Sequence, residues 1–199
     1  MADHFLNIHS WPQAILHIDG DAFFTSIEES IHPDLKGKAL ITGGERGIVA
    51  CASYAAKKIG VKRGVPLHEA AKVCPGLIIL PSDYETYSIF SRRMFNIIRR
   101  FTPQVEEYSI DEAFADVTGL RRALRSPYGK IAADIKREIQ QSLGITVSVG
   151  LSITKVLAKL PAELADDPDV AAIIHTITEG GRAFRRRRVV SLVGIGVLL

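Results

Sequence analysis

Two adjacent acidic residues, Asp111 and Glu112, constrain this chain most, because they lie at the tip of an expected hairpin. The flanking stretches, Gln104 to Ser109 and Ala113 to Val117, have the character of short β-strands. Tight hairpin turns favour Asn-Gly or Asp-Gly, since those residues tolerate positive φ angles. An Asp-Glu pair here is therefore either a solvated turn or a metal site, depending on whether another carboxylate reaches it.

The order of the other elements predicts where this hairpin lies. With residues 31–82 set aside as an insertion, apolar spacing and chain breakers predict strand, helix, helix, strand, strand, helix and strand. This is an α+β chain with the split βαββαβ topology of ferredoxin-like folds. The expected elements are strands at 14–18 and 145–151, the hairpin, and helices at 22–30, 83–101, 126–143 and 154–160. Inside the insertion we expect strands at 39–42, 48–52 and 77–80, and helices at 54–59 and 67–73.

That topology predicts a meeting of distant carboxylates. A right-handed first crossover makes the first two strands outside the insertion parallel, and the third strand fits between them in the opposite direction. The C-terminal end of the first strand and the hairpin tip then lie at the same edge of the sheet. Asp19 ends the first strand, so we expect Asp19, Asp111 and Glu112 to converge.

Three carboxylates without histidine or cysteine suit Mg²⁺ or Mn²⁺, which prefer hard oxygen ligands. A bare cluster would repel itself, and divalent cations remove that cost. Two ions about 4 Å apart can promote in-line phosphoryl displacement, and polymerases are known examples. The cluster therefore predicts metal-assisted phosphoryl or nucleotidyl transfer but does not select the substrate.

Composition sets broader limits. With 199 residues, 47% of them apolar, the chain can form one medium domain or two small ones. Net charge is only +3, yet residues 1–30 hold five acids and no Lys or Arg, and residues 31–160 carry a net +8. An acidic focus in a basic body suits a site for cations and polyanions, although basic helices that simply face water explain the charge as well.

Location is also constrained by composition. Two cysteines are too few for a disulfide framework and fit a reducing compartment. No signal peptide is visible, and the apolar run Val189–Leu199 is about half the length of a membrane span. We therefore expect a cytoplasmic protein without a membrane segment.

Four stretches carry a resemblance to a known family. They are Ile18–Phe24 (IDGDAFF), Ser53-Tyr54, Val105–Thr118 (VEEYSIDEAFADVT) and Ser148–Lys155 (SVGLSITK). In this order they resemble the Y-family, lesion-bypass DNA polymerases, most of all the DNA polymerase IV type. The resemblance implies a palm from residues 1–30 and 83–165, a small fingers insertion at 31–82, and a partial thumb at 166–199 with no little-finger domain.

The resemblance also implies roles for individual residues. Asp19, Asp111 and Glu112 would be the catalytic metal ligands, with the carbonyl of Gly20 as a backbone ligand. Phe24 matches the steric gate that rejects a 2′-hydroxyl, although a core aromatic explains this position too. The other implied nucleotide-binding residues are Phe23, Ser53, Tyr54, Lys57 and Lys159. The implied DNA-binding residues are Lys155, Arg185, Arg186, Arg187 and Arg188, and we expect Asp21 and Asp116 to be supporting or structural.

The implied activity is template-directed addition of deoxynucleotides to a primer, in translesion synthesis and DNA repair. Its cofactors would be two Mg²⁺ ions, with Mn²⁺ as a substitute. Its partners would be primer-template DNA, deoxynucleoside triphosphates and a sliding clamp bound through a region missing here. The chain is expected to be a monomer.

Several positions depart from the family pattern. Lys57 replaces the usual Arg and loses its bidentate fork. Pro161 interrupts an expected helix, and Asp166 or Asp167 stands where the family has a lysine near the triphosphate. These departures keep a second hypothesis open, a non-catalytic polymerase fragment or DNA-binding accessory module. A nucleotidyl cyclase is a third, against which the fingers insertion and the Phe23-Phe24 pair argue.

Overall fold

The computed structural model describes residues 13–164. Within this range the chain forms two compact units. The first unit contains residues 13–19, 97–137 and 148–164, and the second contains Gly20–Asn96 and Glu138–Val147. The expected palm and fingers bounds stay a prediction. Each unit is described by itself.

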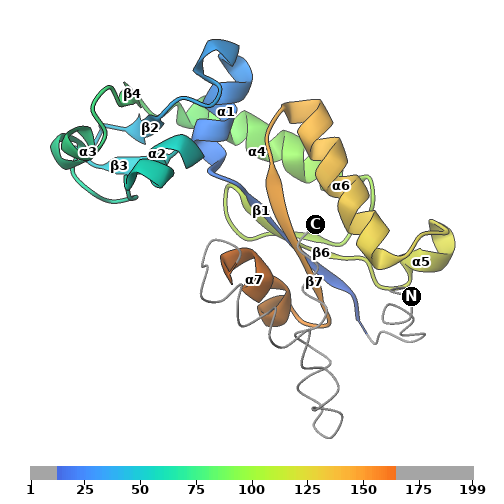
Figure 1. The fold of residues 1–199 in the computed structure, drawn as a ribbon. Coiled ribbons are helices and arrows are strands. Elements are labelled where there is room, and N and C mark those ends of the chain that lie inside the picture. The colour runs from blue at the N-terminus through green and yellow to red at the C-terminus, as the bar shows by residue number, and fades with distance from the viewer. Residues whose placement is uncertain (1–12, 165–199) are drawn as a thin grey trace, which may run out of the picture. The chain divides into compact units, whose positions relative to one another are not determined.

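The first unit is built on a four-stranded sheet (Figure 1). Its strand order is β5-β6-β1-β7, with bounds Val105–Glu107, Glu112–Asp116, Ile15–Gly20 and Val147–Ser152. Strand β6 pairs in antiparallel fashion with both β1 and β5. In chain order β1, β5 and β6 are the first, second and third strands of this sheet. The third, β6, therefore lies between the first and the second, as the sequence predicted.

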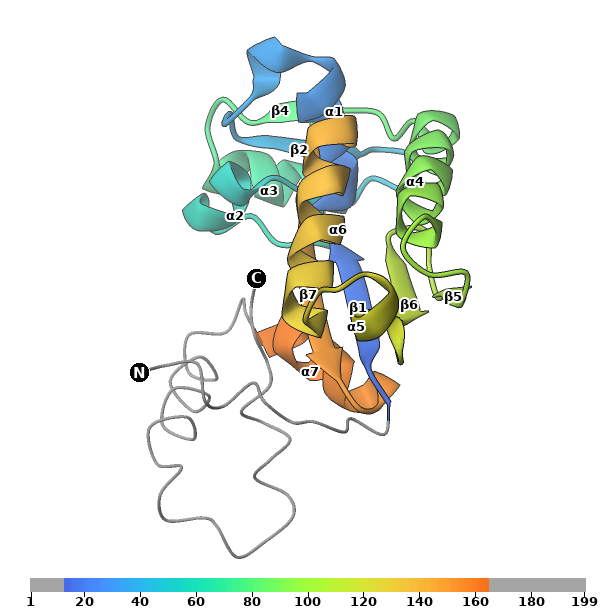
Figure 2. The same ribbon diagram turned by 90° about the vertical axis from the view of Figure 1, so that its right-hand side faces the viewer.

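The two faces of this sheet differ in chemistry. Because successive side chains of a strand point to opposite faces, alternate residues of β1 and β6 lie on different sides of the sheet. One face is fully buried and apolar: Leu16, Ile18, Ala113 and Ala115. The other face carries His17, Asp19, Glu112 and Phe114. The first half of α6, a helix at Tyr128–Leu143, and α7, at Lys155–Leu164, lie on opposite sides of the sheet in both views (Figures 1 and 2).

Helix α7 lies on the polar face and packs closely on strand β7. A side chain at Gly150 would overlap the carbonyl oxygen of Ala158, so only glycine allows this approach. The helix continues through Pro161, where the sequence predicted an interruption. Proline has no N–H, so it removes one i→i−4 hydrogen bond. The helix nevertheless ends only at Leu164.

The second unit holds a three-stranded sheet of order β3-β2-β4, at Val49–Ala52, Leu40–Gly43 and Ile78–Leu80. Strand β2 pairs antiparallel with β3 and parallel with β4. Helices α2, at Tyr54–Ile59, and α3, at Leu67–Val73, begin and end at the predicted residues. Their small core consists of Ile41, Val49, Ala52, Ala56, Val61, Ala70 and Cys74.

The remaining elements connect or extend these sheets. They are α1 at Phe23–Ile31, a 3₁₀ turn at Pro33–Leu35, α4 at Tyr84–Arg99 and α5 at Leu120–Ala123. The 3₁₀ turn and α5 had no counterpart among the predicted elements. Among residues 13–164, no helix combines the length and apolar character needed to cross a membrane.

Candidate metal centre

The candidate centre lies where β1 and β6 end side by side in the first unit. Asp19 of β1 is directly opposite Glu112 of β6 in the antiparallel register. His17 lies two residues before Asp19, on the same face of the strand. One ligand atom from each of His17, Asp19 and Glu112 lies within 4.8 Å of the others. The predicted meeting of Asp19 with the hairpin acids is thus present for Glu112.

Glu112 is the most enclosed acid of the group, with 7% of its surface exposed. Its Oε1 accepts a hydrogen bond of 2.7 Å from Lys159 Nζ and lies 2.6 Å from His17 Nε2. Burial raises the pKa of Glu112, but the hydrogen bonds and charges of Lys159 and His17 outweigh burial and leave this pKa below its usual value. Glu112 is therefore ionised at neutral pH and presents a negative charge to a cation.

Asp111 does not join this group. Its Oδ1 accepts a hydrogen bond of 2.6 Å from Ser109 Oγ, within the turn that precedes β6. Strand β6 begins only at Glu112, so the strand period does not place the Asp111 side chain. The convergence of three carboxylates is thus met by two acids and a histidine, and the role of Asp111 stays a prediction.

The segment after Asp19 turns sharply, and it belongs to the second unit. Ala22 has φ 45° and ψ 49°, a left-handed conformation that is strained for a residue other than glycine. The backbone carbonyls of Asp21 and Ala22 are each held by a hydroxyl, from Ser26 at 2.6 Å and from Thr25 at 2.9 Å. These bonds fix the start of α1.

Phe23 and Phe24 occupy different environments in the second unit. Phe23 is buried and packs over Gly20, where a Cβ would meet the Phe23 ring at 2.7 Å. Phe24 stacks on Tyr87, with ring centroids 4.4 Å apart and planes at 12°, and meets the edge of Tyr84. Phe23 is thus a core residue, and Phe24 belongs to an aromatic cluster.

The predicted triphosphate residues lie at the start of α2 in the second unit. Ser53 is buried, and its Oγ accepts from the backbone N–H groups of Leu40 and Ala56 and donates to the carbonyl of Lys38. One donor and two acceptors are all a hydroxyl offers, so this side chain has no capacity left for a nucleotide. Beside it, Lys57 Nζ lies 5.0 Å from the ring centre of the exposed Tyr54.

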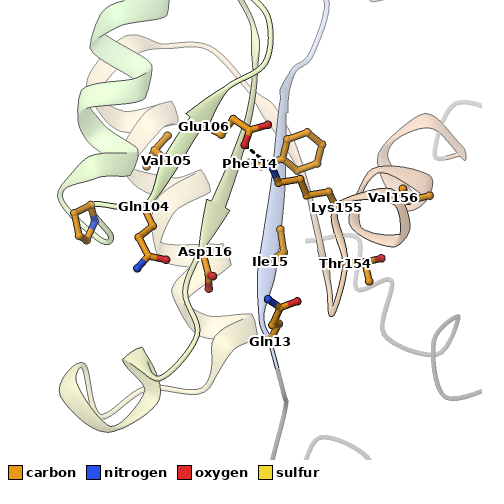
Figure 3. Close-up of a pocket in the computed structure, with 11 residues that line it drawn as sticks. Gln13, Ile15, Gln104, Val105, Glu106, Phe114, Asp116, Thr154, Lys155 and Val156 are labelled. Atoms are coloured by element: carbon orange, nitrogen blue, oxygen red, sulfur yellow. Dashed lines mark hydrogen bonds and ion pairs between the residues drawn. The ribbon is translucent and has the colours of Figure 1, made fainter.

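A shallow pocket of about 650 Å³ opens on the same sheet, at the beginning of β1 (Figure 3). Ile15 and Phe114 form part of its floor, and Lys155 forms an ion pair with Glu106 across its edge. Lys155 Nζ also lies 5.7 Å from the centre of the Phe114 ring. Lys155 is an exposed cation one helical turn from Lys159, and its predicted contact with DNA stays a prediction.

Other predicted positions lie outside the described residues. These are Asp166, Asp167, the thumb segment, and Arg185, Arg186, Arg187 and Arg188. Sequence reasoning also missed one residue inside the described range, His17, which the apolar run around it disguised as part of a core strand. Its signal was the two-residue spacing from Asp19, which places both side chains on one face.

The donor set fits a divalent cation. Asp19 and Glu112 supply hard carboxylate oxygens, and Lys159 shows that Glu112 already pairs with a cation in this structure. Carboxylates gathered at one point of an otherwise basic chain also place negative charge where a polyphosphate would need a bridging metal ion. The arrangement can therefore hold a metal against a phosphorylated substrate.

Known proteins contain regions that are similar in sequence to most of this chain. The sequence pattern of the impB/mucB/samB family matches residues 18–163. A DNA polymerase IV of Desulfatibacillum aliphaticivorans is 43% identical over 152 residues, which are 75% of this chain and 38% of that protein. A DNA polymerase IV of Listeria monocytogenes is 38% identical over 162 residues, 80% of this chain and 45% of that protein. The chain thus spans less than half the length of these curated relatives.

Solved structures show the same likeness in three dimensions. DinB from Sulfolobus solfataricus superimposes with a TM-score of 0.71 at 37% identity, over 75% of this chain and 45% of that one. An insertion ternary complex of Dbh DNA polymerase gives a TM-score of 0.70 at 30% identity, over 92% of this chain and 55% of that one.

Proposed function

The chain belongs to the impB/mucB/samB family of Y-family DNA polymerases, and from this premise we propose that it carries the catalytic part of a template-directed DNA polymerase. The reaction is the addition of deoxynucleotides to a primer, as in translesion synthesis and DNA repair. The observation that carries this proposal is the pairing of Asp19 with Glu112 at one end of the first unit's sheet.

The metal-binding role falls to the acids of this centre. Asp19 and Glu112 hold two Mg²⁺ ions, together with Asp111 and the Gly20 carbonyl, and Mn²⁺ can replace Mg²⁺. When bound, the ions supply activation of the attacking 3′-hydroxyl and stabilisation of the leaving pyrophosphate. The low pKa of Glu112 supports this role, because a ligand must be ionised to hold the cation.

Nucleotide selection falls to residues of the second unit. Tyr54 and Lys57 contact the triphosphate, and Phe24 acts as the steric gate against ribonucleotides. The stacking of Phe24 on Tyr87 supports a gate that is held rigid. The buried hydroxyl of Ser53 and the buried ring of Phe23 act only by shaping the surroundings of this site.

The domain plan of the proposed polymerase follows the family. Residues 1–30 and 83–165 form a ferredoxin-like palm, residues 31–82 form the fingers, and residues 166–199 begin a thumb. Lys155 and the four arginines at 185–188 contact DNA phosphates, and Lys159 serves the incoming nucleotide. The protein acts as a monomer on DNA inside the cell, together with a sliding clamp.

The direct test is extension of a labelled primer on a template with a 5′ overhang, in Mg²⁺ and separately in Mn²⁺. Wild type is compared with Asp111→Ala and with Glu106→Gln, an exposed acid on the same sheet. We expect template-dependent addition by wild type and Glu106→Gln, and none by Asp111→Ala. Addition should weaken as the salt concentration rises, because the proposed contacts of lysine and arginine side chains with DNA phosphates are electrostatic.

The same experiment separates the polymerase from the accessory module. An accessory module binds the DNA, in a gel-shift assay, but extends no primer even at high protein concentration in Mn²⁺. Extension that continues unchanged in Asp111→Ala would come from a contaminating enzyme and would reject the proposal as well.

A further inference from the structure

His17 is buried beside the metal centre without a role in the proposed reaction. Its side chain is fully enclosed, and its ring packs 5.0 Å from that of Phe114 at a tilt of 45°. A leucine or phenylalanine would fill such a place in a strand without a polar group to satisfy. Burying an imidazole is costly unless it forms a good hydrogen bond. Packing alone therefore does not account for histidine here.

The hydrogen bond that His17 makes is aimed at Glu112. Its Nε2 lies 2.6 Å from Glu112 Oε1. Because Glu112 is ionised, its oxygens can only accept, so Nε2 must carry the proton and donate it. The contact thus links an N–H donor to a charged acid, which is the stronger kind of hydrogen bond.

The distance of 2.6 Å between Nε2 and Oε1 is short enough for a hydrogen bond between the two side chains. In this geometry His17 acts on Glu112 as a hydrogen-bond partner.

The position of the bond on Glu112 matters as well. Lys159 donates to the same oxygen, Oε1. Among the described residues, both side-chain hydrogen bonds to Glu112 end on Oε1. Two donors on one oxygen fix the plane of the carboxylate and leave Oε2 to a cation.

We propose that His17 is a positioning residue, which holds Glu112 by an Nε2–H···Oε1 hydrogen bond so that Oε2 points at the metal. The inference rests on the proposed function to the extent that Glu112 binds a cation. Lys159 is partly exposed, at 29%, whereas the His17 side chain is fully buried. His17 is locked in the strand and keeps the carboxylate in place.

The test measures Mn²⁺ affinity of the full 199-residue chain by electron paramagnetic resonance, with three variants of His17. His17→Gln places an amide N–H near the position of Nε2, whereas the shorter His17→Asn has the same chemistry but does not reach Glu112. His17→Leu removes the donor and keeps the packing. We expect His17→Gln to bind Mn²⁺ like wild type, and His17→Asn and His17→Leu to bind it about 10- to 100-fold more weakly.

Melting curves show which variants fold, and if His17→Leu does not, the Gln and Asn pair still decides the question. Equal affinities for these two amides would overturn the inference. A ¹⁴N coupling of directly bound nitrogen on Mn²⁺, present in wild type and lost in His17→Gln, would also overturn it by making His17 a ligand.

The outcomes differ from those of the proposed function. A chain that binds Mn²⁺ but extends no primer rejects the polymerase, and the affinity series still judges His17. A wild-type chain that binds no Mn²⁺ rejects the positioning role directly.

Discussion

Helix α7 carries two lysines one turn apart, and each pairs with a glutamate of the same sheet. Lys159 pairs with Glu112 at the metal centre, where the two side chains are 29% and 9% exposed. Lys155 pairs with Glu106 at the sheet edge, where the two are 50% and 55% exposed. The chemistry is the same, and only the surroundings differ.

The difference teaches what burial does to an ion pair. At the edge, water screens the charges and the side chains lose freedom by pairing, so the net gain is small. At the centre, Glu112 has given up most of its water and depends on Lys159 and His17 for its hydrogen bonds. Breaking the buried pair therefore has consequences that breaking the exposed pair does not.

The largest contrast is expected in metal binding. Glu112→Gln should weaken Mn²⁺ binding at least about 100-fold, since even a partner outside the ligand set is worth about 10- to 100-fold. Glu106→Gln should leave the affinity unchanged. Titration of both variants by calorimetry or paramagnetic resonance checks this, and equal losses would remove Glu112 from the ligands.

The next contrast concerns folding stability. Lys159→Met leaves Glu112 with one donor fewer and should lower the free energy of unfolding by about 1–3 kcal/mol. Lys155→Met keeps the aliphatic stem over Phe114 and should cost no more than about 0.5 kcal/mol. Urea unfolding followed by circular dichroism measures both, and a larger loss for Lys155→Met would invert the comparison.

A smaller effect is expected in the pH dependence of stability. The pKa of Glu112 is lower in the folded chain than its usual 4.5, so the unfolded chain takes up its proton first as pH falls. Its contribution is complete above about pH 4.5 and is lost as pH falls through the folded pKa. The stability difference between wild type and Glu112→Gln should therefore shrink between pH 6 and pH 3, roughly the range that brackets a glutamate's titration. A difference that stays constant over this range would show that Glu112 is not stabilised as an anion.

The smallest effect is expected from salt. In about 1 M NaCl the screening length falls to about 3 Å, so the coupling between Lys155 and Glu106 should fall from a few tenths of a kcal/mol to nearly zero. The coupling between Lys159 and Glu112 should persist, because the pair is partly shielded from the ions. Double-mutant cycles at low and high salt give both values. Equal salt sensitivity would mean that the centre is as wet as the edge.

Sequence patterns predicted the strand order and the pairing of Asp19 with Glu112, because both follow from connection rules and the two-residue period of strands. The same period also places His17 on the face of Asp19. This was not predicted, because the apolar neighbours Leu16 and Ile18 made the whole run resemble a core strand. Asp111 lies in the turn before β6, where the strand period does not apply, so its predicted place beside Asp19 and Glu112 stays a prediction.

Other features depend on contacts that no local pattern encodes. The three hydrogen bonds of Ser53 come from residues up to fifteen positions away in the chain, so its structural role is visible only in the fold. The continuation of α7 through Pro161 was not predicted, because the local sequence shows only that proline removes one hydrogen bond from a helix.

The register between β1 and β6 has a consequence for how this site can change over generations. The pairing that sets Asp19 against Glu112 also turns Leu16 and Ile18 toward the core. Insertion or deletion of one residue in either strand would exchange the two faces, exposing the apolar side chains as it removes the acids from the surface. Chains whose strands are shifted in this way do not fold. A descendant that folds but has lost the chemistry is therefore expected to arise through substitutions of individual side chains.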